Sequence, residues 1–324
     1  MKILSEEIIL KMNKLGKDRV PFVFIIDFEG KSPFILKDNE FKDKILWKTQ
    51  HNGNIPPRHK SKKEFSWDIS PVSFLRYQKA FSIVNKRILK GDSYLINLTM
   101  PSDIKTDLSL EELFYMSDAP YKIYLKDKFI CFSPEIFVRI EKGKISSFPM
   151  KGTIDADIPD AENILRHDKK EIAEHNTIVD LIRNDLSMVA ERVKVKRFGY
   201  IEKIKSNCHD LLQMSSEITG DLSVDYREHL GDIFAKILPA GSITGAPKQE
   251  TVNIIKEAEN YQRGYYSGVF GYFDGDNVDS CVMIRYIEQN NGNLCFKSGG
   301  GITSQSDCRK EYQELIQKIY VPVN

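Results

Sequence analysis

The chain has 324 residues, 41% of them hydrophobic and 10% aromatic, which is enough for a large core in one large domain or two small ones. Its 47 Lys and Arg residues nearly balance 46 Asp and Glu residues, and the formal charge of +1 argues against nucleic acid as a partner. The sequence predicts no membrane span and no signal peptide, and five scattered cysteines without a C-x-x-C pair favour a reducing cytoplasm.

The first elements with a clear pattern lie in the N-terminal third. Residues 48–64 combine His, Gly, two prolines and a basic run at 58–63, which is typical of a solvated loop. Residues 74–89 carry apolar side chains at helical spacing and are followed by Lys90 and Gly91, which predicts a helix with a defined end. Residues 94–98 are typical of a strand.

Short β-prone runs and helical patterns then come in blocks. Four runs separated by turn signals predict an antiparallel meander, at residues 121–124, 129–132, 136–140 and 145–148. Helical patterns follow at residues 168–190, 226–237, 248–259 and 307–320, and strands are predicted between the last two helices at residues 268–273, 280–287 and 294–298. Blocks of strands separated by helices, rather than strict alternation, predict an α+β fold with mainly antiparallel sheet.

Two of the predicted helices carry glutamates three residues apart. Glu171 and Glu174 share one helix face, and Glu311 and Glu314 share a face of the closing helix. If the two helices meet, four carboxylates converge, and a hard cation such as Mg²⁺ would hold them together. Such pairs also occur on solvated helix faces in a chain with 29% charged residues. A di-iron site is the other metal option, because His175 follows Glu174, but the strand-rich middle argues against the bundle it needs.

Two glycine-rich segments and one lysine are further candidates. Residues 239–248 precede a helix and residues 298–302 follow a strand, so both can bring backbone N–H groups close to an anion or simply form a turn. Lys151 lies among apolar residues between Pro149 and Gly152. A partly desolvated lysine loses proton affinity and can act as a nucleophile or base, whereas most lysines are exposed and inert.

Seven motifs, taken in this order, resemble those of the chorismate-utilising enzymes: anthranilate synthase component I, aminodeoxychorismate synthase component I, and isochorismate and salicylate synthases. The matching motifs are S-P-E at 133–135, P-M-K-G-T at 149–153, K-E-I-A-E-H-N-T-I-V-D-L-I-R-N-D-L at 170–186, G-S-I-T-G-A-P-K at 241–248, R-G-Y-Y-S-G at 263–268, D-S-C-V-M-I-R at 279–285, and G-G-G-I with E-Y-Q-E at 299–314. The resemblance implies antiparallel sheets packed as a sandwich with helices outside, in one catalytic domain over residues 1–324 whose first 65 residues are a shortened, less typical part.

Within that family, Lys151 favours aminodeoxychorismate synthase component I, because anthranilate synthases carry alanine in the matching motif. The resemblance implies that Lys151 attacks C2 of chorismate as the C4 hydroxyl leaves, and that ammonia then adds at C4 and expels the lysine to give 4-amino-4-deoxychorismate, a precursor of 4-aminobenzoate and folate. Leu95 stands where isochorismate and salicylate synthases carry a lysine base, which argues against addition of water. Anthranilate synthase component I and a non-catalytic chorismate-binding subunit remain the alternatives.

The resemblance also assigns an acid and a metal site. Glu135 would protonate the departing hydroxyl. Glu174 and Glu314 would bind Mg²⁺ directly, while Glu171 and Glu311 would hold its waters. Because the chain has no cysteine-centred glutaminase segment, ammonia would come from a separate glutamine amidotransferase subunit.

The remaining implied contacts concern the substrate. Tyr266, Arg285 and the backbone of Gly301 would grip the carboxylate on the enolpyruvyl side, because an arginine is suited to bidentate contact with a carboxylate. Thr244 and His209 would line the pocket near the ring.

Overall fold

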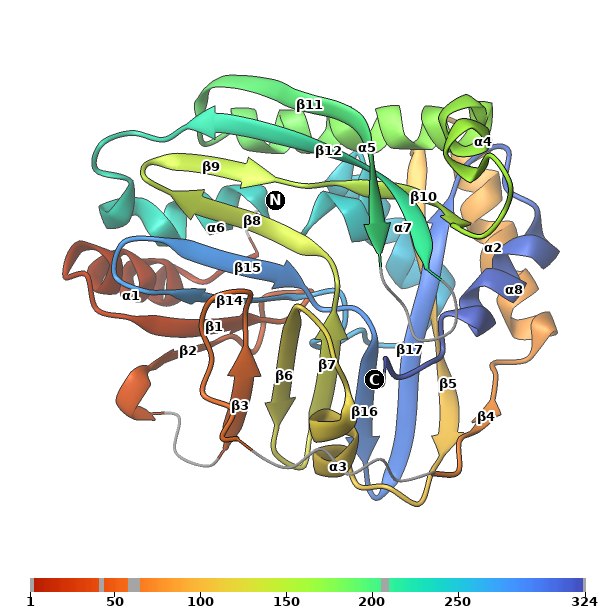
Figure 1. Cartoon of the computed structure of the whole chain (residues 1–324), viewed down its shortest axis with the longest axis horizontal. Helices are drawn as coiled ribbons and strands as arrows, with labels where there is room; N and C mark the ends of the chain where they lie inside the picture. Colours follow the sequence, from red (N-terminus) through yellow and green to blue (C-terminus); the bar gives the residue numbers. More distant parts are fainter. Residues whose placement is uncertain (1–2, 41–43, 58–64, 205–209, 323–324) are drawn as a thin grey trace.

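The computed structural model describes residues 3–40, 44–57, 65–204 and 210–322, and it is built on two antiparallel sheets (Figure 1). The first sheet has the order β10-β12-β9-β8-β15-β14-β1-β2, with β11 added on the outside of β12. Its strands are β1 (Phe22–Ile26), β2 (Phe34–Lys37), β8 (Ile136–Glu141), β9 (Lys144–Ser147), β10 (Met150–Asp155), β11 (Glu191–Ile204), β12 (Leu211–Asp221), β14 (Val269–Phe273) and β15 (Val278–Val282).

The second sheet has the order β13-β5-β17-β16-β7-β6-β3, with β4 paired to β5. Its strands are β3 (Ile45–Lys48), β4 (Asp68–Ser70), β5 (Leu95–Lys105), β6 (Tyr121–Leu125), β7 (Phe129–Ser133), β13 (Gly245–Ala246), β16 (Tyr286–Asn290) and β17 (Asn293–Ile302). Every strand pair that the structure describes is antiparallel. The residues before position 65 contribute strands to both sheets.

The helices cover the sheets from outside. They are α1 (Glu6–Lys17), α2 (Phe74–Leu89), α3 (Leu110–Met116), α4 (Ala161–His167), α5 (Lys169–Ser187), α6 (Leu230–Ile237), α7 (Lys248–Glu259) and α8 (Cys308–Gln317), with short 3-10 turns η1 (Asp38–Glu40), η2 (Tyr226–His229) and η3 (Gly241–Ile243). Helix α5 packs on β10, β11 and β12, whereas α2, α7 and α8 contact β5 and β17 (Figure 1). The predicted α+β fold, with antiparallel sheets and helices outside, is confirmed.

Alternation along β1 shows why the sheets stack. Phe22, Phe24 and Ile26 point into the core beneath the helices, whereas Val23 and Ile25 join a second core that contains residues of β3, β6 and β7 from the other sheet. A strand whose two faces are both buried reads as a continuous apolar run, because successive side chains alternate between the faces. The second core therefore binds the two sheets together as a sandwich.

Two short connections that carry the chain from one sheet to the other lie side by side. The chain leaves β7 for β8 through Pro134 and Glu135, and it leaves β15 for β16 through residues 283–285. The crossings are hydrogen-bonded to each other, because Val282 N donates to Glu135 O at 3.1 Å and Phe132 N donates to Arg285 O at 3.0 Å. Glu135 and Arg285 are thus placed together by the route of the chain.

The crossings also correct two predictions. The expected meander is divided, with β6 and β7 in the second sheet and β8 and β9 in the first. Proline cannot donate to a ladder, so Pro134 ends β7. The strand expected at 280–287 is broken in two, since Arg285 adopts a left-handed φ of 54° that no strand accommodates.

Most predicted helices are confirmed. Helices α2 and α7 have the predicted bounds, Ser73 caps α2 by accepting from Arg76 N, and Asp168 accepts from Glu171 N at the start of α5. The basic run of the predicted loop lies outside the described residues. Among the residues that the structure describes, no helix combines the length and the apolar character that crossing a membrane requires.

Candidate active site

A cavity of about 530 Å³ opens between the two crossings and the helices α5 and α8. Nine of the predicted site residues line it: Glu135, Lys151, Glu171, Glu174, Tyr266, Arg285, Gly301, Glu311 and Glu314. They come from seven separate elements or connections of both sheets, so the topology assembles one site from residues up to 179 positions apart in sequence (135 to 314).

The amine of Lys151 lies inside this cavity. Lys151 is on β10, its side chain is 25% exposed, and its Nζ is 3.9 Å from Glu174 Oε2 on α5. A β-bulge follows Lys151, and Gly152 adopts a left-handed φ of 72° where a Cβ would lie 2.9 Å from Leu165. Glycine at this position therefore lets β10 approach the helices. On the other side, a Cβ on Gly301 would be 3.2 Å from the Lys151 amine.

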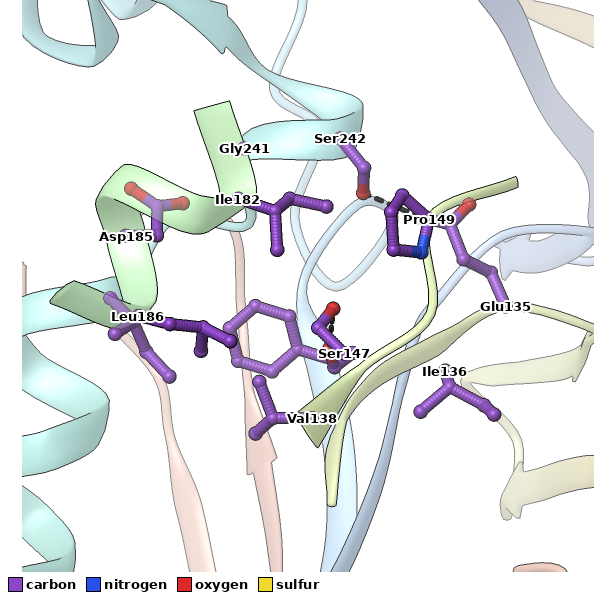
Figure 2. A pocket seen from close by; sticks show the side chains of 12 residues that line it. Glu135, Ile136, Val138, Ser147, Pro149, Ile182, Asp185, Leu186, Gly241 and Ser242 are labelled. Atoms are coloured by element: carbon purple, nitrogen blue, oxygen red, sulfur yellow. Dashed lines mark hydrogen bonds between the residues drawn. The ribbon is translucent and has the colours of Figure 1, made fainter. Parts of the chain in front are cut away.

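Glu135 is a carboxyl whose proton affinity is increased by its surroundings. Burial raises the pKa of Glu135, while the hydroxyl of Ser242, which donates to Oε1, and the charge of Lys151 act in the opposite direction. Figure 2 shows Ser242 and Glu135 joined by this hydrogen bond near Pro149. A partly buried carboxyl facing the same cavity as an amine suits proton transfer to a leaving group.

Tyr266 and Arg285 present donors suited to an anion. Tyr266 is 3% exposed, and burial raises the pKa of its phenol, so the hydroxyl is neutral and can donate. The Arg285 guanidinium lies over the Tyr320 ring with Cζ 5.0 Å from the ring centroid. Within the described part of the chain, its buried Nε has no hydrogen-bond partner. A carboxylate in the cavity would satisfy that donor, as buried polar groups require.

Lys318 is a cavity residue that sequence reasoning missed. Its Nζ donates to Gly299 O at 2.9 Å and to Glu314 Oε1 at 2.6 Å, and burial lowers its pKa against the raising effect of Glu314. Its place in the cavity could have been predicted from its spacing, because Lys318 follows Glu314 by four residues and must share its helix face. Lys318 is therefore a third basic residue of the cavity, after Lys151 and Arg285, and it is bonded to one of the glutamates.

The four glutamates line the cavity, but their carboxylates do not converge on one point. Glu311 is 5% exposed and the Glu174 side chain 12%, so the solvated-face interpretation fails for these two. Among the described residues, no group of three or more His, Cys, Asp or Glu side chains is close enough to hold a metal ion alone. At Gly300, a Cβ would lie 3.3 Å from Glu314 Oε1 and 3.6 Å from Glu311 Oε2, so glycine keeps this space open. Oxygen donors of this kind fit Mg²⁺, which takes one or two carboxylates and completes its shell with water and substrate oxygens.

His175 does not supply the ligand that a di-iron site needs. It is 0% exposed, its Nε2 is 2.7 Å from Ser216 Oγ, and its ring faces Phe198. Burial lowers its pKa to about 4, so the imidazole is neutral at ordinary pH. His175 is therefore a packed residue beneath the first sheet.

One predicted residue is not among those that line the cavity, and another cannot be placed. Thr244 is 0% exposed and its hydroxyl donates to Ala240 O at 2.8 Å, whereas its neighbours Ser242 and Ile243 line the cavity. A threonine hydroxyl so placed satisfies the backbone of its own loop. His209 lies outside the described residues.

One glycine-rich segment differs from its interpretation as a turn, and the other precedes a helix as predicted. Residues 299–301 do not form a turn after a strand but continue β17, paired with β5 along Asn97 to Thr99. A Cβ on Gly299 would lie 2.3 Å from Leu98 O, so the glycines allow the two strands to approach closely. The segment at 239–248 contains η3 and β13, and its Lys248 turns away to bond Asp185.

A family model for chorismate binding enzymes matches residues 20–324. This chain belongs to the chorismate binding enzyme family. A protein of Haemophilus influenzae described as an uncharacterized PabA-like protein is 48% identical to it, over 98% of this chain and 97% of that protein. The aminodeoxychorismate synthase component 1 of Salmonella typhimurium is 29% identical, over 92% of this chain and 67% of its own length. The crystal structure of anthranilate synthase component I from Streptococcus pneumoniae matches with a TM-score of 0.68 at 24% identity, covering 90% of this chain and 70% of that one, which supports the fold.

One buried ion pair fixes the loop at the rear of the site in this chorismate-binding enzyme. Lys248 Nζ is 2.7 Å from Asp185 Oδ2 and donates to Ile237 O, and both side chains are at most 15% exposed. Burial raises the pKa of Asp185 to about 6 and lowers that of Lys248, so each charge depends on the other. The pair joins α5 to the start of α7.

We expect Asp185→Asn to lower the free energy of unfolding by about 3 kcal/mol, because it leaves the Lys248 ammonium buried without its carboxylate. Urea unfolding followed by circular dichroism measures this value. Asp180→Asn is the matched control on the same helix, since Asp180 pairs with Arg183 at a surface where both side chains are more than half exposed. Equal losses in the two variants would contradict the expectation, and the double variant Asp185→Leu/Lys248→Met should recover part of the loss.

Proposed function

We propose that this chorismate-binding enzyme is an aminodeoxychorismate synthase component I, which converts chorismate and ammonia to 4-amino-4-deoxychorismate for 4-aminobenzoate and folate synthesis. The observation that carries the proposal is the amine of Lys151 in the cavity, with the Glu135 carboxyl on the same wall. The named relative from Salmonella typhimurium supports the same activity. Lysine rather than alanine in the P-M-K-G-T motif favours it over anthranilate synthase component I.

The first half of the reaction forms a covalent adduct. The lone pair of neutral Lys151 Nζ forms a bond to C2, the ring electrons shift toward C4, and the C4–O bond breaks. Glu135 gives its proton to the departing oxygen, which leaves as water, and Glu135 becomes a carboxylate. Splitting a difficult substitution into two easier steps is the advantage of a nucleophilic side chain.

In the second half of the reaction, the ring electrons shift back. Ammonia bonds to C4, the ring electrons return, and the C2–Nζ bond breaks so that Lys151 leaves as a neutral amine. The Glu135 carboxylate takes one proton from the incoming nitrogen and regains its starting state. The two halves together consume chorismate and ammonia and release 4-amino-4-deoxychorismate and water.

The basic residues of the cavity, together with Mg²⁺ bound among the glutamates, would suit a dianionic substrate. Arg285, Tyr266 and the backbone of Gly301 would bind the enolpyruvyl-side carboxylate, and Lys318 adds a second positive charge in the same cavity. Mg²⁺ would be held by Glu174 and Glu314, with Glu171 and Glu311 bonded to its waters. When bound, the ion would neutralise and orient the carboxylate on the ring.

The product of a single incubation tests the proposal. Purified chain is mixed with chorismate, Mg²⁺ and ammonium, and the products are separated by liquid chromatography and identified by mass. We expect 4-amino-4-deoxychorismate. Anthranilate with pyruvate would instead establish anthranilate synthase activity, and unreacted chorismate with measurable binding would establish a non-catalytic chorismate-binding subunit.

We further expect glutamine to replace ammonium only when a glutamine amidotransferase subunit is added. The physical reason is that burial raises the thiol pKa of all four cysteines among the described residues, so none of them is suited to attack an amide and release ammonia: Cys131, Cys281, Cys295 and Cys308. The rate with glutamine, measured with and without the added subunit, checks this. Amination with glutamine by the chain alone would contradict it.

A further inference from the structure

The loop that precedes α7 meets the proposed general acid directly. Ser242 lies on η3, 107 residues from Glu135 in sequence, and its Oγ donates to Glu135 Oε1. In Figure 2 the two side chains stand at one end of a small space that Asp185 and Gly241 also line. This space is about 20 Å³, so it admits at most a water molecule.

The backbone around Ser242 is fixed on several sides. Arg263 Nη1 donates to Ile243 O at 3.0 Å, and Thr244 donates from its amide to Gly241 O and from its hydroxyl to Ala240 O. At Gly241, a Cβ would lie 2.9 Å from Asp185 Oδ2, so the loop rests directly on α5.

Arg263 is itself immobilised. It is 3% exposed and forms a two-point ion pair with Glu259, with Nη2 at 2.6 Å from Oε1 and Nε at 2.9 Å from Oε2. A bidentate pair of this kind has a defined geometry. The Ser242 hydroxyl is therefore held in place before any substrate binds, which is what a preorganised contact requires.

We propose that Ser242 is a positioning residue for Glu135: its hydroxyl occupies Oε1, so the proton that Glu135 transfers is carried on Oε2. This inference rests on the proposed general-acid role of Glu135. A carboxyl without such a contact can rotate and can carry its proton on either oxygen, so part of the population faces the wrong way. The hydrogen bond from Ser242 keeps the proton on Oε2 and holds the Glu135 carboxyl in one position relative to Lys151.

The same bond affects when Glu135 is protonated. Burial raises the pKa of Glu135, and the Ser242 bond lowers it, because a donated hydrogen bond stabilises the carboxylate. Removing the hydroxyl must therefore raise the pKa further. A general acid works in its protonated form, so the loss of activity at high pH should move to higher pH in a variant without the hydroxyl.

The kinetic experiment compares wild-type protein with Ser242→Ala and Ser242→Thr over a range of pH. We expect kcat of S242A to fall about tenfold, which corresponds to the loss of one ordinary hydrogen bond to the neutral carboxyl. The loss of S242A activity at high pH, the alkaline limb of its kcat profile, should shift to higher pH, while KM should change little. S242T should restore both kcat and the wild-type position of the alkaline limb. Ser82→Ala is the matched control, because Ser82 is an exposed residue of α2 whose hydroxyl bonds only Gln78 O. A drop in kcat with an unmoved limb, or no recovery in S242T, would overturn the proposal.

A second readout does not depend on the reaction. Infrared difference spectra recorded during a pH titration show the carboxyl band of Glu135, which is identified by its absence in Glu135→Gln. That band should titrate at higher pH in S242A than in wild type and S242T. If wild type makes no aminodeoxychorismate but the band shifts as stated, the hydrogen bond stands and the proposed function fails. An unshifted band in folded S242A would contradict the role of Ser242 whatever the enzyme produces.

Discussion

We expect the replacement of Lys151 with alanine to remove the proposed covalent intermediate and to lower kcat for aminodeoxychorismate formation by roughly 10³-fold. Side chains that act as nucleophiles typically cost this much or more when deleted, because the remaining site must carry out a direct substitution. The amine stands 3.9 Å from Glu174 and faces the cavity, with the backbone of Gly301 on its other side. Lys318, the other lysine that lines the cavity among the described residues, is bonded to Gly299 O and Glu314 Oε1.

Intact-mass spectrometry measures the intermediate. Wild-type chain is mixed with chorismate and Mg²⁺ without ammonia and quenched in acid, and it should gain the mass of chorismate less one water. Peptide mapping should place that mass on Lys151. Lys151→Met, which keeps the apolar stem, should behave like Lys151→Ala and show no gain.

Lys144→Ala provides the matched control. Lys144 lies on β9, the strand that precedes β10 in sequence, has a side chain that is 66% exposed, and pairs with Asp221 at the surface. It should keep both the adduct and the rate. An adduct of unchanged yield in K151A would show that another residue reacts, and the proposed mechanism would then be wrong.

The sequence predicted local features of the fold better than those set by distant contacts. The bounds of α2 followed from its apolar spacing, its cap at Ser73 and the glycine after it, all of which lie within the helix or beside it. Strand β5 was predicted as five residues, yet it extends over Leu95–Lys105, because β17 pairs along it from Ile302 to Leu294. Nothing in residues 99–105 alone identifies that partner. Strand length here depends on a segment about two hundred positions away.

In the site, too, local features could be predicted from the sequence and distant contacts could not. The two glutamate pairs could be predicted as groups on shared helix faces, because their spacing is local, and the structure brings both to one cavity. Ser242 could not be predicted as the partner of Glu135, since their contact depends on the crossing between the sheets and on the loop fastened by Asp185 and Lys248. Thr244 was chosen instead of Ser242 because a residue pattern does not show which side chain of a loop faces inward.

Replacing Glu174 with glutamine should weaken Mg²⁺ binding strongly and lower kcat about 10²-fold at a fixed Mg²⁺ concentration. The amide keeps the shape of the side chain but removes the negative charge that a hard cation prefers, and the side chain is only 12% exposed. The substitution also removes the carboxylate beside Lys151. Intact-mass measurement of the adduct in this variant therefore distinguishes weaker Mg²⁺ binding from a change in the reactivity of Lys151. Glu314→Gln should act in the same direction from α8, where Gly300 leaves space beside its carboxylate.

Titration with Mn²⁺, a paramagnetic substitute for Mg²⁺, measures binding without any turnover. Free Mn²⁺ is counted by electron paramagnetic resonance, and we expect the apparent Kd to rise at least tenfold in E174Q and in E314Q. Glu162→Gln on α4 is the control, because Glu162 is a 58% exposed side chain paired with Arg166 outside the cavity. Raising the Mg²⁺ concentration should restore part of the activity of E174Q, since weakened binding can be overcome by mass action. Unchanged Mn²⁺ binding in both glutamate variants would place the metal elsewhere and leave the paired glutamates as partners of Lys151 and Lys318 alone.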